Sequence, residues 1–193
     1  MKTAFTLSEV IITIGVIGVV SAMTLPAVIN KINDHHFKTA YKKAYSDLSN
    51  VLQRAVSEDA IDLSAKNYYS SLKPYFKAVK SCENDNAFDC WVDADRVCTG
   101  TCNGNKPDKY SKMFIDTSGR AWGEYYWGDN ILLVDTNGSK GPNQFGKDRW
   151  VFGYKTQNGM PIKVVPTMTD GDIKYPHPWC NHPPCYYHSW LYK

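Results

Sequence analysis

The sequence predicts an α+β fold, in which one long N-terminal helix precedes a small antiparallel sheet and packs on it. Two observations predict this fold. Apolar residues recur at helical spacing through residues 29–56, and short apolar segments separated by turn residues follow from Met113 onward. Helix first and strands afterwards, without alternation, is typical of the α+β class.

The N-terminal half of the helix, residues 5–29, is expected to cross a membrane. Val10–Ile29 form twenty consecutive residues without a charge. About 20 apolar residues at 1.5 Å rise span the hydrocarbon of a bilayer. One acid, Glu9, precedes the run. Because a carboxylate near lipid is costly, Glu9 requires a partner, and a free amine at a new N-terminus would supply one.

The segment Ala4–Glu9, with the sequence Ala-Phe-Thr-Leu-Ser-Glu, resembles the processing site of type IV prepilins and type II secretion pseudopilins. In that family a prepilin peptidase removes a short leader and N-methylates the new terminal residue. The resemblance implies that residues 1–4 are the leader, that cleavage follows Ala4, and that Phe5 becomes the first mature residue. Family members usually have Gly at the position of Ala4.

The resemblance extends into the helix, where Gly18 and Pro26 match family positions, and it implies roles in assembly for these residues and Glu9. It implies a filament subunit that polymerises through this helix, with pilin-like subunits, the prepilin peptidase and inner-membrane assembly machinery as partners. The implied location is the bacterial inner membrane, with the C-terminal domain outside the cytoplasm, and then a filament in the periplasm or at the cell surface.

Two other interpretations of the N-terminus stay open: an uncleaved anchor without a polymer role, and a signal peptide cleaved after Ala22. Lys2, the apolar run and the small residues around Ala22 fit a signal peptide, whereas Glu9 opposes it. The basic flank 31–43 alone would place the C-terminal domain in the cytoplasm. We instead expect an oxidising compartment, because all six cysteines lie beyond the membrane segment.

Beyond the membrane segment, the helix becomes amphipathic, because apolar residues recur at three- and four-residue steps over 29–56. The pattern predicts one helix from about Thr6 to Ser57, on the order of 75 Å long, with Pro26 as a candidate kink. Residues 30–193 are numerous enough for one domain with its own core, against which the amphipathic half would lie.

Shorter elements are expected in the rest of the chain. A second helix is predicted over Asn67–Lys80, with Pro74 as a break, and 81–109 is expected to be a disulfide-stapled insertion. The tail 175–193 is rich in Pro, His and aromatic residues and has no assignable regular structure. Five strands of an antiparallel meander are predicted: Met113–Asp116, Ala121–Trp127, Ile131–Val134, Trp150–Tyr154 and Ile162–Val165.

The loop between the third and fourth predicted strands concentrates oxygen ligands. Calcium takes six to eight oxygens in irregular geometry. The loop lacks the turn glycine and the bidentate Glu of an EF-hand, but it is similar to the calcium loops of major pseudopilins. We expect calcium as a cofactor; the alternative is a Gly- and Asn-rich turn without metal. The candidate ligands are Asp135, Asn137, Ser139, Asn143 and Asp148.

Six cysteines allow fifteen disulfide pairings, and sequence proximity favours three of them. In the tail, two cysteines together with His182 and His188 could instead bind zinc, although a disulfide is favoured outside the cytoplasm. The favoured pairs are Cys82–Cys90, Cys98–Cys102 and Cys180–Cys185.

The composition argues against two function classes. The 22 basic and 19 acidic residues are too balanced for nucleic-acid binding. No Ser/His/Asp order, phosphate loop or carboxylate pair indicates an enzyme. The resemblance at Ala4–Glu9 makes a structural filament subunit the leading expectation. A minor, tip-located or membrane-anchored protein that binds a ligand like an adhesin stays open, because the 13 Tyr and 6 Trp could form either a binding face or a core.

Overall fold

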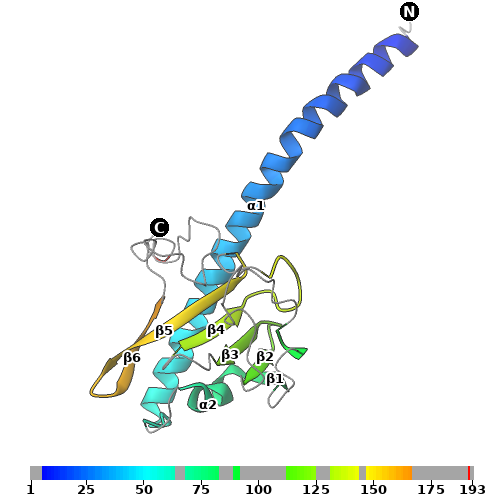
Figure 1. Ribbon diagram of the computed structural model, residues 1–193. Coiled ribbons are helices and arrows are strands. Elements are labelled where there is room, and N and C mark those ends of the chain that lie inside the picture. The colour runs from blue at the N-terminus through cyan, green and yellow to red at the C-terminus, as the bar shows by residue number, and fades with distance from the viewer. Residues whose placement is uncertain are drawn as a thin grey trace, which may run out of the picture. The chain divides into compact units, whose positions relative to one another are not determined.

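The computed structural model describes residues 6–63, 68–82, 89–91, 112–124, 131–143, 147–166 and 191. The chain divides into two compact units, Met1–Phe37 and Lys38–Lys193. The predicted α+β class is confirmed, with a long N-terminal helix and an antiparallel sheet on which the C-terminal part of that helix packs (Figure 1).

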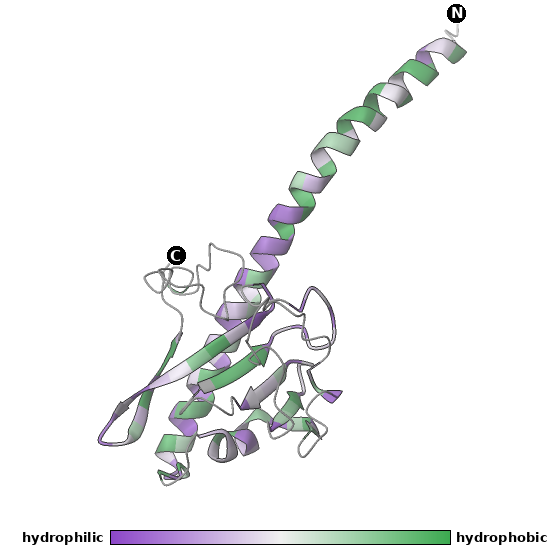
Figure 2. Cartoon of the chain, viewed as in Figure 1, coloured by the Kyte–Doolittle hydropathy of each residue, from purple (hydrophilic) through white to green (hydrophobic). Residues whose placement is uncertain are grey.

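The first element is α1, which runs from Leu7 to Ser57, as the apolar period predicts. Pro26 lies inside it without ending it. In the first unit, hydrophobic turns dominate the helix (Figure 2). By length and composition, this helix is apolar enough to cross a membrane.

In the second unit, α1 buries one face at the predicted three- and four-residue steps. Tyr41 packs on two aromatic rings of the sheet, with centroid distances of 4.6 Å to Trp150 and 5.5 Å to Phe152. Further along the helix, Asp47 Oδ2 forms an ion pair with Arg120 Nη1 at 2.7 Å. The buried stripe consists of Tyr41, Ala44, Leu48, Leu52 and Ala55.

The sheet is a six-stranded antiparallel meander in which strands adjacent in sequence are also neighbours in space. The five predicted strands are present, and an additional edge strand, β1, precedes them. Gly119 and Gly159 have positive φ angles of 80° in the turns that join β2 to β3 and β5 to β6. The strands are β1 (Ala78–Cys82), β2 (Met113–Asp116), β3 (Ala121–Glu124), β4 (Ile131–Asp135), β5 (Arg149–Gln157) and β6 (Met160–Pro166).

The predicted helix Asn67–Lys80 is wrong in its second half. The helical part comprises α2 (Tyr69–Leu72) and the 3-10 turn η1 (Lys73–Phe76). Pro74 lies in the first turn of η1, where its missing N–H costs least. Lys77 then adopts a left-handed conformation with φ of 52°, which ends the turn, and β1 begins at the next residue.

Aromatic residues fill the core between α1, η1 and the sheet. Trp122 and Trp150 are fully buried, and the ring of Phe76 lies 4.6 Å from that of Trp122. The Tyr- and Trp-rich composition therefore serves packing in the described part of the domain. The tail 175–193 lies outside the described residues except for Leu191, and so do Ala4, Phe5, Cys98, Cys102, Cys180 and Cys185.

Candidate functional site

The helix N-terminus is closed by a reciprocal pair of contacts between Thr6 and Glu9. The backbone N–H and the Oγ1 hydroxyl of Thr6 both donate to Glu9 Oε2 at 2.8 Å. In return, the Glu9 N–H donates to Thr6 Oγ1 at 3.3 Å. This arrangement is a capping box, which satisfies two backbone donors that the helix leaves open. Sequence reasoning missed Thr6, although the Thr-x-x-Glu signature was present.

Beyond this cap, the helix exposes a long apolar surface. Fourteen of the seventeen large apolar side chains that are exposed in the described residues belong to α1, between Leu7 and Ile32. Soluble monomers rarely expose contiguous apolar patches of more than a few hundred Å². An exposed apolar surface of this kind is typical of a segment that contacts lipid or other protein chains.

Gly18 and Pro26, the two other predicted assembly residues, both lie within α1. A Cβ added at Gly18 would meet no atom within 4 Å, so its own chain does not require a small residue there. Pro26 cannot donate a hydrogen bond to the carbonyl of Ala22, four residues earlier. Thr24 Oγ1, one turn away from Val20, donates to the Val20 carbonyl at 3.0 Å.

The predicted calcium loop joins β4 to β5, and Asp148 organises it. Thr136 N–H and Oγ1 both donate to the Asp148 carbonyl, at 2.8 Å and 2.9 Å. The Asp148 carboxylate is fully buried. Its Oδ2 atom accepts from Asn143 N–H at 2.7 Å and from Asn137 Nδ2 at 3.1 Å. Asn137 Nδ2 also donates to the Gly141 carbonyl at 3.1 Å. Three of the five predicted ligands therefore lie together.

The donor set of this loop fits a hard cation such as calcium. The Oδ1 atoms of Asn137 and Asn143 are buried and accept no hydrogen bond in the described part of the chain. Buried polar oxygens usually have partners, so two orphans in one loop call for a ligand or water. Amide, carbonyl and carboxylate oxygens are the ligands that calcium takes, and Asp148 adds a negative charge.

The other two predicted ligands occupy different positions. Asp135 Oδ2 pairs with Arg149 Nε at 2.8 Å, and both side chains are 1% exposed. Its Oδ1 accepts from the Asn137 N–H at 3.2 Å. Burial raises the pKa of Asp135 to about 7, the hydrogen bond and charge of Arg149 oppose that rise, and the charge of Asp148 adds to it. Asp135 thus holds the loop backbone through the Asn137 N–H and forms an ion pair with Arg149, whereas Ser139 is exposed.

No group of three or more His, Cys, Asp or Glu side chains that could hold a metal occurs among the described residues. The result covers carboxylate clusters as well as His and Cys clusters. A cation in the loop would therefore depend on amide and backbone carbonyl oxygens beside the carboxylate of Asp148. The His- and Cys-rich tail that could bind zinc lies outside the described residues.

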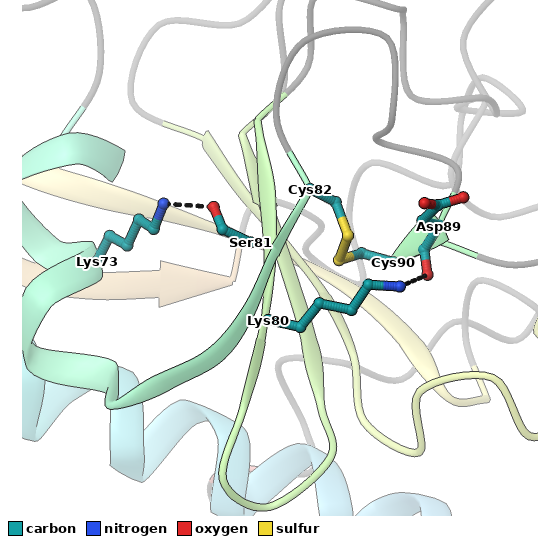
Figure 3. Close-up of a disulfide and its surroundings, with 6 residues drawn as sticks. All are labelled: Lys73, Lys80, Ser81, Cys82, Asp89 and Cys90. Carbon is teal, nitrogen blue, oxygen red and sulfur yellow. Dashed lines mark hydrogen bonds between the residues drawn. A yellow bond between two sulfur atoms is a disulfide. The ribbon is translucent and has the colours of Figure 1, made fainter.

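The predicted disulfide between Cys82 and Cys90 is confirmed, with an S–S distance of 2.00 Å (Figure 3). It joins the end of β1 to a short segment whose next residue is Trp91. The Trp91 ring lies 4.5 Å from the guanidinium carbon of Arg149 and is 2% exposed. Sequence reasoning did not single out Trp91 or Arg149.

In comparisons with known proteins, no protein-family model, curated protein or solved structure matches the chain.

Proposed function

We propose that this protein is a structural subunit of a type IV pilus-like or type II secretion pseudopilus filament that polymerises through the first unit of α1. The observation that carries the proposal is the exposed apolar surface of that unit, which runs from Leu7 to Ile32. The prepilin-like sequence at Ala4–Glu9 gives this surface a specific route into a filament. The α+β architecture supports the proposal, because the globular unit takes its own core from the amphipathic part of the helix.

In this proposal, lipid covers the apolar surface before assembly, and the helices of other subunits cover it afterwards. Removal of residues 1–4 exposes the amine of Phe5. The carboxylate of Glu9 then pairs with the amine of a neighbouring subunit, because a charged group in a helix bundle requires a partner. The small Gly18 permits close helix approach, and Pro26 removes one backbone hydrogen bond, so that the helix can stretch locally.

We also propose calcium as a cofactor of the globular unit. Asn137, Asn143 and Asp148, with the Gly141 carbonyl, would hold the ion. A bound calcium would supply positive charge to the Oδ1 atoms of Asn137 and Asn143, which lack a donor in the described part of the chain. Because the loop groups lie close together only in the folded chain, the ion would stabilise the folded state. The globular unit would then be stiffer in a calcium-containing compartment.

The filament proposal is tested by the N-terminus of the mature protein. Mass spectrometry should find chains that begin at N-methylated Phe5. Ala4→Gly, which restores the usual residue of the family, should be processed at least as completely. A matched control is Ala22→Leu, which should leave processing intact. A mature start at Met23, lost in Ala22→Leu, would show a signal peptide, and unprocessed Met1 alone would show a plain anchor; either result overturns the proposal.

A further inference from the structure

Two strands of the sheet end in the same arrangement of Asp, Arg and Trp. In the first, Asp116 ends β2, and its Oδ1 accepts from the N–H of Ser118, two residues later, at 2.8 Å. Its Oδ2 accepts from Arg120 Nε at 3.0 Å. The guanidinium of Arg120 lies 5.4 Å from the centre of the Trp122 ring. Asp116, Arg120 and Trp122 all belong to the β2–β3 hairpin, and their arrangement is called the Asp116 turn below.

The second arrangement repeats these contacts at the end of β4. Asp135 Oδ1 accepts from the N–H of Asn137, again two residues later, and its Oδ2 accepts from Arg149 Nε. The guanidinium of Arg149 lies 4.5 Å from the centre of the Trp91 ring, closer than in the first turn. Both members of the ion pair are almost completely buried, so the indole shields a charge pair that water would otherwise reach.

The two turns differ in where the tryptophan comes from. Trp122 belongs to β3, the strand that follows its turn directly. Trp91 lies 44 residues before Asp135 and outside the β4–β5 hairpin. The Cys82–Cys90 disulfide fastens its segment to β1, and three strands separate β1 from β5 in the sheet. The tryptophan that covers this ion pair therefore follows directly after a cysteine whose disulfide partner ends a distant strand of the sheet.

We infer that the Cys82–Cys90 disulfide holds Trp91 over Arg149 and thereby positions the Asp135–Asp148 loop for its cation. The contacts form one chain. Trp91 covers Arg149, Arg149 fixes Asp135, and Asp135 holds the backbone of Asn137. The side chain of Asn137 then reaches Asp148. Trp91 acts as a positioning residue, and its effect on cation binding rests on the proposed calcium site.

Loop order can be measured by hydrogen exchange of the whole chain in detergent micelles, without calcium. Cys82→Ser/Cys90→Ser and Trp91→Ala should each raise exchange in 136–143 by about tenfold, because water reaches the ion pair that anchors the loop. Trp91→Phe, which keeps an aromatic face, should stay close to wild type. The Asp116 turn, residues 117–121, is the internal control and should not change.

A second variant keeps the test decisive where Trp91→Ala fails to fold. Arg149→Lys keeps the positive charge under the ring but loses the Nε contact with Asp135, and it should loosen the same loop. Equal acceleration in the loop and the Asp116 turn would show general destabilisation and would overturn the inference. An unchanged loop in Cys82→Ser/Cys90→Ser would overturn it as well.

Calcium titration calorimetry on the same samples supplies the functional arm. Trp91→Ala should raise the Kd for calcium by about tenfold, and Trp91→Phe should change it little. Wild-type protein that binds no calcium would remove the calcium proposal, while the exchange experiment would still decide whether the disulfide controls the loop. Calcium affinity unaffected by Trp91→Ala, despite a loosened loop, would show that Trp91 does not position the ligands.

Discussion

Replacing Glu9 by glutamine separates the two roles that its carboxylate can have. In the structure, Glu9 caps its own helix through Thr6, with contacts of 2.8 Å to the backbone and hydroxyl donors. In the proposed filament, it also neutralises the amine of a neighbour. A capping box accepts Gln as well as Glu, so Glu9→Gln keeps the cap and removes only the charge. Glu9→Ala removes both, and Thr6→Ala removes part of the cap while keeping the charge.

The two roles differ in magnitude. Loss of an N-cap side chain costs roughly 0.5–2 kcal/mol. Leaving a charge unpaired where water is excluded costs roughly 3–5 kcal/mol. Since about 1.4 kcal/mol corresponds to a factor of ten, Thr6→Ala should lower the assembly equilibrium by roughly 2- to 30-fold. Glu9→Gln and Glu9→Ala should each lower it by at least a hundredfold.

The assay compares filament-bound with membrane-bound subunit in cells that assemble the filament. Sheared filaments and membranes are separated and quantified by immunoblotting, and total subunit provides the control for expression and insertion. We expect all three variants to insert normally. The charge-pairing argument would fail if Glu9→Gln assembled like wild type while Thr6→Ala showed a strong defect. That result would show that Glu9 acts only as a cap.

Three further outcomes are expected. Calcium at a hundredfold excess over its Kd should stabilise the folded chain by about 2.7 kcal/mol and raise its Tm by about 5–10 °C relative to chelator. Magnesium should raise the Tm little. Asp148→Asn should abolish the rise with calcium, and Ser139→Ala, at an exposed position, should retain most of it. The hydrogen bond from Arg54 lowers the pKa of Glu58, so its stabilising contribution should be present above its unfolded pKa and disappear as pH falls through the folded value; carbon NMR titration should show a higher Glu58 pKa in Arg54→Gln. Finally, Gly18→Ala should leave the helical circular dichroism intact but reduce filament yield, since its own chain leaves room for the added methyl group.

The elements predicted best from sequence are those whose signals are local. The strand Met113–Asp116 has the predicted bounds because a Thr-Ser-Gly turn follows it at once. The helix to Ser57 follows from its apolar period. The disulfide Cys82–Cys90 follows from proximity in the sequence. In each case, neighbouring residues contain enough information to specify the structure.

Long-range contacts specify the features that were missed. The first four residues of β1, Ala78–Ser81, are exposed, so no alternation marks the strand; it forms because it pairs with β2. Arg149, a charged residue at the start of β5, is 1% exposed because Asp135 and a distant tryptophan enclose it. Five loop residues were predicted as ligands, but only Asn137, Asn143 and Asp148 lie together, and Asp135 forms an ion pair with Arg149. Composition cannot distinguish these roles.

The division of α1 into two units explains why one helix can serve two purposes. Over Leu7–Ile32, its apolar side chains are exposed, so substitutions there act through whatever covers the helix and leave the domain core unchanged. Over Tyr41–Ala55, a narrow stripe is buried, so substitutions there act on folding. Within the second unit, Tyr41 of this stripe packs on Trp150 and Phe152 of the sheet. A long exposed apolar surface of this kind is consistent with the proposed subunit, which lipid would cover before assembly and neighbouring helices afterwards.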